Sequence, residues 1–409
     1  MRVPIALLWL LAGPAAFAQT SPQVQAPPPA EEPSFSACLP GLVARAKEQG
    51  VTAALAEAQL SGLAADPDVA AATGRQAEFE KPVWAYLDSA VSDEAVADGK
   101  AKLASEGSRP AIEAAFGVDR HVLVAIWGIE SGYGRVLDDP RKVRPVLRSL
   151  ATLACAGGPR VATWTGELVA ALRILDLGRT TPERLTGSWA GAMGHTQFMP
   201  TTYLRHGLDF DGDGRADIWT SAPDALASTA QYLRTLSWHP GEAWGGEVRL
   251  PEGFDYRLAD ETTLRPLSGW RALGVTPAGR AIGADADEAR LVLPAGARGP
   301  AFLLRPNFAA LLGYNAAFSY ALAVAHLADR LRGEPGFVHP WPREDRPLAA
   351  DERREIQAAL EAKGHPVGGV DGRIGPRSRA AIRAWQAQAG LVPDGYADAG
   401  LLERLRAGN

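Results

Sequence analysis

Cysteine is nearly absent from this chain of 409 residues, which contains only Cys38 and Cys155. Two cysteines allow one disulfide at most, and composition alone leaves a bonded pair and two buried free thiols equally open. A large block of basic residues is also missing, and the net charge is −5. These features argue against nucleic acid or an anionic membrane surface as the main partner.

No long hydrophobic run marks a membrane helix, but the N-terminus carries a shorter one. Arg2 precedes an apolar stretch at residues 5–12, and residues 16–18 read Ala-Phe-Ala. This order is typical of a secretory signal peptide (1–18) with Gln19 as the first mature residue, and the stretch is too short for a mature membrane helix. No cysteine stands at the cleavage site to carry a lipid. Since export leads to an oxidising compartment, we predict that the two cysteines form a disulfide.

Eight apolar residues or glycines, residues 122–129, run directly into Glu130. Their number and the absence of alternation predict a buried helix, with Asp119 as its N-cap. Ile126 and Trp127 lie one turn before Glu130 on the same face, so we expect its carboxyl group in a dry place, where burial raises a pKa. A carboxylic acid that stays protonated near neutral pH suits general-acid catalysis. The competing interpretation is a structural glutamate paired with an arginine or a backbone N–H.

A second motif, residues 187–200, is rich in glycine and alanine, which let the backbone approach a ligand closely. Ser188, His195, Thr196 and Gln197 offer neutral hydrogen-bonding groups suited to hydroxyls and acetamides. A lone histidine such as His195 is more often structural than catalytic. Tryptophan is abundant, with 11 residues, and such large rings suit both a core and stacking on sugar faces.

Residues 209–217 match the first nine positions of an EF-hand calcium loop, with acidic residues at positions 1, 3, 5 and 9 and glycine at position 6. Thr220 replaces the bidentate glutamate of position 12, so an acid four residues further on becomes the candidate for the last ligand. The candidate metal ligands are Asp209, Asp211, Asp213, Arg215 through its backbone carbonyl, Asp217 and Asp224. The competing interpretation is a loop of Asx turns without a metal.

The composition changes along the chain. Residues 37–116 are rich in alanine with helical periodicity, whereas residues 241–305 hold short runs broken by glycine and proline, which predicts a small β-containing insertion. Glycine and proline at residues 333–347 indicate a domain boundary. After it come two Asp-Gly turns, at Asp371 and Asp394, and each feeds a helical pattern. The C-terminus is therefore predicted to be a three-helix module with a weak internal repeat.

Several of these motifs occur together in a known family. They are Trp127-Gly-Ile-Glu130-Ser-Gly-Tyr-Gly, Gly191-Ala-Met-Gly, Gln197-Phe-Met-Pro, the Asp209 loop and Tyr314-Asn315. On these motifs, residues 35–335 resemble the membrane-bound lytic murein transglycosylase B family, glycoside hydrolase family 103. The C-terminal residues, with Val370-Asp-Gly and Ala384-Trp-Gln, resemble the peptidoglycan-binding domain type 1.

The resemblance implies a mainly α fold, in which a lysozyme-like helical catalytic core has a helical flanking region and a small β insertion, followed by the three-helix module. It implies cleavage of the β-1,4 bond between N-acetylmuramic acid and N-acetylglucosamine in peptidoglycan. Glu130 stands where the family has its single catalytic glutamate. We expect it to act first as acid and then as base, leaving 1,6-anhydromuramyl ends, because no second acid lies in a comparable apolar segment. The positions that match substrate-contacting residues are Ser188, Gln197, Tyr232, Tyr314, Asn315 and Tyr320.

The resemblance also implies a structural Ca²⁺ ion in the Asp209 loop, no organic cofactor, and a periplasmic protein without a transmembrane anchor in its mature form. Its expected partners are peptidoglycan glycan strands and no nucleic acid; partners in wall synthesis or division stay open. The expected divisions are a signal peptide (1–18), a Pro-rich linker (19–34), the catalytic domain (35–335, with the insertion at 241–305), a linker (336–345) and the peptidoglycan-binding domain (346–409).

Two other functions remain open at this stage. One is an ordinary muramidase, in which water takes the place of the internal hydroxyl. The other is a non-catalytic wall-binding scaffold on an enzyme-like fold, since a fold does not guarantee activity. The intact Glu130 argues against the scaffold.

Overall fold

The computed structural model describes residues 34–72, 81–105 and 107–408. The predicted signal peptide and nearly all of the Pro-rich linker lie outside the described residues, so both remain predictions.

The largest hydrophobic core surrounds two long helices, α8 (Arg120–Ser131) and α15 (Phe318–Arg332). They run in opposite directions, since Tyr320 near the start of α15 contacts Glu130 near the end of α8, and Arg332 contacts Asp119 at the other end. Trp127 on α8 is among the largest fully buried side chains. The helices around this pair are α5 (Val83–Ala90), α6 (Asp93–Ser105), α7 (Ser108–Phe116), α12 (Ala222–Thr235) and α14 (Pro306–Tyr314).

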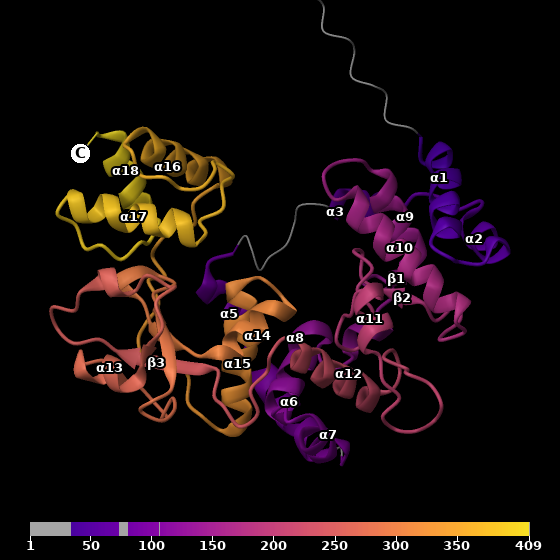
Figure 1. Ribbon diagram of the computed structural model, residues 1–409, viewed down its shortest axis with the longest axis horizontal. Helices are drawn as coiled ribbons and strands as arrows, with labels where there is room; N and C mark the ends of the chain where they lie inside the picture. The colour runs from indigo at the N-terminus through magenta and orange to yellow at the C-terminus, as the bar shows by residue number, and fades with distance from the viewer. Residues whose placement is uncertain (1–33, 73–80, 106, 409) are drawn as a thin grey trace, which may run out of the picture.

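A second helical core holds the N-terminal helices against the middle of the chain (Figure 1). Its helices are α1 (Phe35–Glu48), α2 (Ala53–Leu60), α3 (Pro67–Ala72), α9 (Val146–Cys155), α10 (Val161–Asp176) and α11 (Pro200–His206). A disulfide joins Cys38 in α1 to Cys155 at the end of α9, with the Cα atoms 5.9 Å apart, so the predicted bond is confirmed. The short strands β1 (Arg144–Pro145) and β2 (Thr186–Gly187) pair antiparallel and bring the start of the glycine-rich motif against α9. A short 3-10 helix, η1 (Arg135–Asp138), lies between α8 and β1 in the chain.

A five-stranded antiparallel sheet lies between the helical part and the C-terminal module, in the order β4-β6-β7-β3-β5. Its strands are β3 (Gly245–Arg249), β4 (Arg265–Pro266), β5 (Thr276–Pro277), β6 (Glu288–Val292) and β7 (Ala301–Leu304), with α13 (Leu267–Ala272), η2 (Tyr256–Leu258) and η3 (Gly296–Arg298) between them. Along β7, Phe302 and Leu304 join the core of α8, whereas Ala301 and Leu303 join a small core with Trp270 of α13. The two-residue period of a strand thus places the sheet between two apolar layers.

The C-terminal module has a hydrophobic core of its own, formed by α16 (Ala350–Ala362), α17 (Pro376–Gln388) and α18 (Ala399–Arg406). Ile356, Ile382 and Leu402 contribute one buried side chain from each helix. With these three helices, the mainly helical fold with a small β insertion that the sequence predicts is confirmed.

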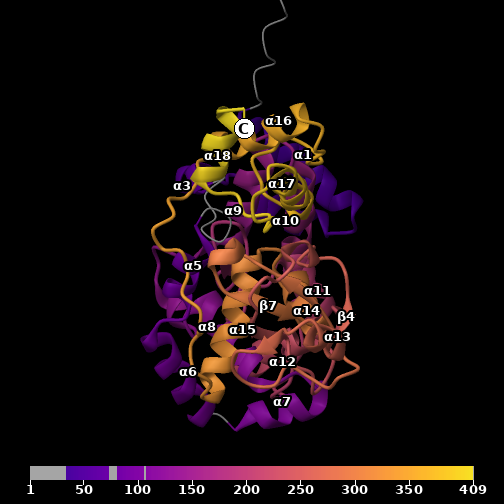
Figure 2. The same ribbon diagram turned by 90° about the vertical axis from the view of Figure 1, so that its left-hand side faces the viewer.

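The module lies above the β insertion in Figure 2, and polar side chains join the two. Arg379 of α17 binds both carboxylate oxygens of Glu261, at 2.5 and 2.7 Å. Arg298 of η3 pairs with Asp345 and Asp398, at 2.6 and 3.0 Å. Bidentate Arg–carboxylate pairs fix orientation as well as distance, so the module has a defined place on the insertion.

The segment that leads to the module is attached to the helical part and to the sheet. Arg343 forms two hydrogen bonds with Asp88 of α5, and the ring of Trp341 lies 6.1 Å from that of Trp84. Glu247 of β3 accepts the backbone N–H of His339 at 2.8 Å. This connecting segment is therefore held against α5 and β3 by hydrogen bonds.

In the described parts of the chain, no single helix has the length and apolarity to cross a membrane. Only α14 and α15 taken together have that length and apolarity, and the two helices are bent by 119° relative to each other.

Candidate active site

Helix α8 presents Glu130 in its last turn. Asp119 caps its start by accepting the backbone N–H of His121 at 2.7 Å, as predicted. The helix ends because Gly132, Tyr133 and Gly134 all have positive φ, between 58 and 92°. Glycine adopts this left-handed conformation without strain, which explains the two glycines at this helix end; Tyr133 adopts it as a non-glycine residue.

Glu130 is hydrogen-bonded to a buried tyrosine. The Tyr320 hydroxyl donates to Glu130 Oε1 at 2.6 Å, and the Tyr320 side chain is 2% exposed. Burial, and then the charge of Glu130, raise the pKa of Tyr320 well above its usual value, so the phenol stays protonated and remains a donor. Tyr314 stacks on Tyr320 with centroids 6.3 Å apart and rings nearly parallel, and burial raises its pKa in the same way. Tyr320 therefore contacts the carboxyl group as a neutral donor, and Tyr314 supports the Tyr320 ring.

From Tyr314 the aromatic contacts continue away from Glu130. The ring of Tyr232 on α12 lies 5.5 Å from Tyr314, and His206 stacks on Tyr232 at 4.9 Å. Phe198 of the glycine-rich motif contacts both tyrosines, at 5.8 and 6.3 Å. Rings from α15, α14, α12, α11 and the glycine-rich motif thus form one row that begins at the candidate acid.

The glycine-rich motif is locked onto the end of α8. Trp127 Nε1 donates to His195 Nδ1 at 3.0 Å, and Ser131 Oγ donates to the backbone oxygen of His195 at 2.6 Å. A Cβ atom added at Gly134 would lie 2.8 Å from the His195 ring, so glycine is needed there. Burial, with a smaller effect of the nearby Lys102, lowers the pKa of His195 to about 4. The neutral ring accepts the Trp127 proton, which supports the structural interpretation of His195.

Ser188, Gln197 and Asn315 are half-buried and hold backbone in place. Ser188 Oγ accepts the N–H groups of Ala190 and Ala192 at 3.3 and 3.2 Å. Gln197, with a positive φ of 52°, donates to the oxygen of Gly194 at 2.8 Å. Asn315 Oδ1 accepts the Ala317 N–H at 3.0 Å, next to Tyr314. Each contact leaves further amide or hydroxyl capacity for a ligand.

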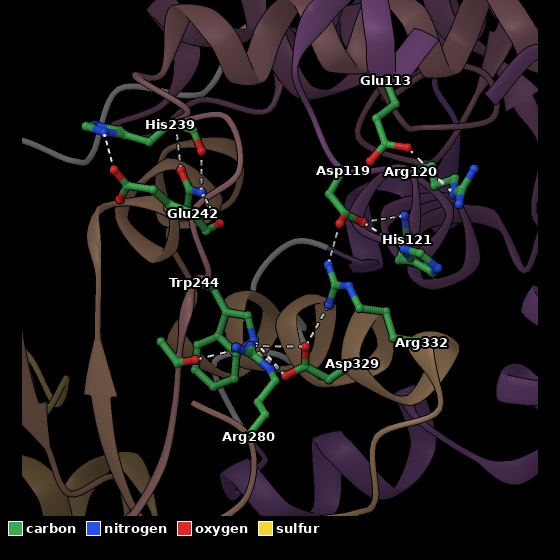
Figure 3. A network of polar contacts seen from close by, with 12 residues as sticks. Glu113, Asp119, Arg120, His121, His239, Glu242, Trp244, Arg280, Asp329 and Arg332 are labelled. Carbon is green, nitrogen blue, oxygen red and sulfur yellow. Dashed lines mark hydrogen bonds and ion pairs between the residues drawn. The ribbon is translucent and has the colours of Figure 1, made fainter. Parts of the chain in front are cut away.

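A charged network closes the opposite end of α8 (Figure 3). Arg332 joins Asp119 at 2.8 Å to Asp329 at 2.7 Å, and Asp329 also accepts from Trp244 Nε1 at 2.9 Å and from Arg280 at 3.2 Å. A cavity of about 360 Å³ opens beside these residues. Asp119 and Arg332 of its lining pair with each other, and Asp119 lies about 16 Å along the helix from Glu130, since α8 rises 1.5 Å per residue.

The acidic loop gathers three of its predicted ligands. Asp209, Asp211 and Asp213 are exposed, and each offers a carboxylate oxygen within 4.8 Å of the other two. Three converging carboxylates of this spacing fit a hard divalent cation such as Ca²⁺. Asp209 also accepts the N–H groups of Gly212 and Gly214, at 2.7 and 2.8 Å, and these bonds set the turn.

The other two predicted acids hold the shape of the loop and do not join the cluster. Asp224 is fully buried and accepts the N–H groups of Phe210 and Asp217, both at 2.8 Å. Burial, only partly offset by these bonds, raises its pKa. Asp217 accepts from the backbone and the hydroxyl of Thr220, at 2.9 and 2.6 Å. The backbone N–H of Arg215 donates to Asp213 at 2.8 Å.

Comparisons with known proteins agree with this geometry. The family model described as "Transglycosylase SLT domain" matches residues 34–329, and that described as "Putative peptidoglycan binding domain" matches residues 349–405. The chain belongs to the transglycosylase SLT domain family. The resemblance to lytic murein transglycosylases inferred from the motifs is thereby confirmed, and the chain is an enzyme of the lytic transglycosylase type that acts on peptidoglycan.

Relatives of this transglycosylase include membrane-bound lytic murein transglycosylase B of Escherichia coli, 33% identical over 217 residues. That alignment covers 52% of this chain and 56% of the relative. SltB3 from Pseudomonas aeruginosa, solved in complex with NAG-anhNAM-pentapeptide, is 45% identical with a TM-score of 0.85, covering 91% of this chain and 99% of that one. The lytic transglycosylase Slt35 of Escherichia coli, solved in complex with calcium, is 26% identical with a TM-score of 0.60, covering 72% and 92%.

Two features of the transglycosylase site were not predicted from the sequence. One is the direct bond from Tyr320 to Glu130, because the sequence predicted Tyr320 only as a substrate-contacting residue. The other is the Trp127–His195 bond that joins the two motifs. Gly134 carried a signal for the Trp127–His195 bond, since a glycine directly after a helix indicates that another group packs closely against the backbone there.

Proposed function

We propose that this enzyme cleaves the β-1,4 bond between N-acetylmuramic acid and N-acetylglucosamine in peptidoglycan and closes a 1,6-anhydro ring on the muramyl product. The observation that carries the proposal is the setting of Glu130. Its carboxyl group accepts the Tyr320 hydroxyl, and from Tyr320 a row of neutral aromatic rings continues to Tyr314 and beyond. The complex of SltB3 with NAG-anhNAM-pentapeptide supports it, because that ligand contains an anhydro sugar by name.

Glu130 performs two proton transfers in sequence. Protonated Glu130 first gives its proton to the leaving glycosidic oxygen, and the carboxylate then takes a proton from the C6 hydroxyl of the same muramyl residue. That hydroxyl attacks C1, and because it is tethered to the sugar it outcompetes water through a high effective molarity. The N-acetyl group of the substrate stabilises the positive charge at C1 between the two transfers, which replaces a second protein carboxylate.

Tyr320 supports the first transfer. When Glu130 loses its proton, negative charge develops on the oxygen that already accepts the Tyr320 hydroxyl. A preorganised donor at that position stabilises the charge without rearrangement. The parallel contact with Tyr314 holds the Tyr320 ring in place.

We assign the binding of the glycan strand to the row of rings that begins beside Glu130 and to the glycine-rich motif. Tyr232 and Tyr314 offer ring faces for sugars, and Ser188, Gln197 and Asn315 offer neutral donors and acceptors for hydroxyl and acetamide groups.

A Ca²⁺ ion in the acidic loop completes the proposal for the catalytic domain. Asp209, Asp211 and Asp213 would hold it, with the backbone carbonyl of Arg215 as a further oxygen, and Asp217 and Asp224 would orient the loop. The ion would supply positive charge that relieves carboxylate repulsion. Since the loop precedes α12, which carries Tyr232, its effect would be on stability and not on the reacting bond.

We further propose that the C-terminal module retains the enzyme on the wall, and that the predicted signal peptide directs the chain to the periplasm. The domain limits predicted from the sequence belong to the same proposal. The family match to a peptidoglycan-binding domain at residues 349–405 supports the role of the module.

Digestion of purified sacculi followed by mass spectrometry tests the reaction. Products should be lighter by one water than those of a muramidase, and reducing ends would contradict the ring closure. Glu130→Gln keeps the side-chain shape and an oxygen for the Tyr320 donor, so it should bind glycan and lose nearly all turnover. The matched control is Glu113→Gln, since Glu113 sits on α7 in a loose pair with Arg120 at 3.6 Å. An active Glu130→Gln enzyme would exclude Glu130 as the acid.

A further inference from the structure

The C-terminal module contains the same hydrogen-bonded turn twice. In the first, Gln357 donates to Asp371 Oδ1 at 3.0 Å and accepts the Gly372 N–H at 2.7 Å. In the second, Gln386 donates to Asp394 Oδ1 at 2.9 Å and accepts the N–H of the next residue, a glycine, at 2.8 Å. In both, Oδ1 of the aspartate also accepts the N–H two residues later, at 2.8 and 3.0 Å. The two turns are therefore equivalent in structure as well as in sequence.

The second turn already has a ligand, which is part of this chain. Asp394 Oδ2, the oxygen not used within the turn, accepts the backbone N–H of Ala297 at 2.9 Å. The neighbouring Gly296 lies so close to Tyr396 that an added Cβ would be 2.7 Å from it. Arg298 then pairs with Asp398 at 3.0 Å. The turn thus recognises a main-chain amide with one small residue and one charged residue beside it.

The first turn keeps the equivalent oxygen open. Asp371 is exposed, and the hydrogen bonds that fix it in the turn, from Gln357 and from the Arg373 N–H, both end on Oδ1. Val370, immediately before it, exposes 47% of its surface. Donation by the Gln357 amide, then by the Arg373 N–H, lowers the pKa of Asp371, so the acceptor is charged at neutral pH.

We propose that the first turn binds the peptide part of peptidoglycan, with Asp371 Oδ2 accepting a main-chain N–H as Asp394 Oδ2 does in the second turn. The proposal rests on the wall-binding role proposed above for the module and names its ligand and the contacting atom.

The charges around the turn favour a peptide that carries a carboxylate. Glycine at position 375 stands where the second turn has Asp398, so the first turn lacks the acid that receives Arg298. Arg377 is exposed, and its side chain lies over Gly368, where an added Cβ would be 2.6 Å from the Arg377 Cδ. An exposed guanidinium over Gly368, in the loop that leads to the N–H acceptor, matches a peptide that offers an amide and a carboxylate.

The test uses the full chain with Glu130→Gln, so that the wall is not digested during binding. Three probes are compared: intact sacculi, glycan strands freed of peptide by an amidase, and the soluble peptides that the amidase releases. Asp371→Asn keeps Oδ1 for the turn and replaces the accepting oxygen with a donor. Its matched control, Asp394→Asn, makes the same change in the docked turn. Circular dichroism establishes that both variants are folded.

A hydrogen bond to a charged group contributes a factor of roughly ten to one hundred in affinity, so Asp371→Asn should weaken peptide binding by about that factor. Asp394→Asn should leave peptide binding unchanged, and Arg377→Gln should weaken it for peptides with a free carboxylate. Equal peptide affinity of Asp371→Asn and the parent, equal loss in both Asn variants, or binding only to peptide-free glycan would each overturn the inference. The product masses of the wild-type enzyme are a separate measurement, so this inference and the proposed reaction can fail independently.

Discussion

Replacing Tyr320 with phenylalanine tests how the site controls its single acid. The change removes the hydroxyl that donates to Glu130 Oε1 at 2.6 Å and keeps the ring that stacks on Tyr314. The packing of the buried side chain is therefore retained, and the lost interaction is one hydrogen bond to a group that becomes charged. Such a bond is worth about 1.5–3 kcal/mol, which corresponds to a fall in kcat of roughly ten- to one hundred-fold.

The pH dependence should change in a defined direction. A donor favours the charged form of the carboxyl group that accepts it. Without the Tyr320 hydroxyl, Glu130 should stay protonated to higher pH, so the pH of maximal activity should rise. A variant that merely loses stability would show a lower activity with the same pH profile.

The assay is turnover of a soluble glycan fragment between pH 4 and 8, with the melting temperature measured alongside. Tyr203→Phe is the matched control, because Tyr203 is equally buried and donates to the backbone oxygen of Ala216 at 2.8 Å, away from Glu130. The reasoning fails if Tyr320→Phe keeps kcat within two-fold of the wild type, or if Tyr203→Phe lowers kcat as much.

Three further predictions concern stability. The pKa of His195 is lowered to about 4, below the unfolded value of about 6.5. The neutral ring therefore contributes up to about 3 kcal/mol to the free energy of unfolding above pH 6.5, and this contribution declines as the pH falls towards 4. Urea unfolding of His195→Gln should accordingly depend less on pH than that of the wild type. Reduction of the Cys38–Cys155 bond, which spans 117 residues, should lower the free energy of unfolding by about 4–5 kcal/mol on the chain-entropy estimate, and a melt unaffected by reductant would contradict this. Added Ca²⁺ should raise the melting temperature and a chelator should lower it, with Asp211→Asn insensitive to both; equal melts with and without the ion would remove the site.

The elements of this fold were predictable where local signals decide them. The run before Glu130 and its cap at Asp119 predicted α8, and the structure has both because an apolar helix with a satisfied N-terminus needs no distant information. The Asp-Gly turns of the C-terminal module were visible for the same reason. The β insertion was visible as a change in composition, although the strand order was not.

The contacts that make the site were less predictable, because they join residues far apart in the chain. Tyr320 is separated from Glu130 by 190 residues, and no periodic pattern specifies which of several buried tyrosines reaches the acid. Asp224 shows a different limit. Its spacing suggested a metal ligand, but the direction of a carboxylate depends on the loop backbone, and here it faces the N–H groups of Phe210 and Asp217.

The antiparallel pairing of α8 and α15 has a consequence for how distant substitutions act. Tyr320 meets Glu130 at one end of the pair, and Arg332 meets Asp119 at the other. Sliding one helix by a single residue would shift it about 1.5 Å and break both contacts together. The far charge pair therefore holds the axial position of the Glu130 carboxyl group. A survey of variants that ranks residues by distance from Glu130 would place Arg332 too low.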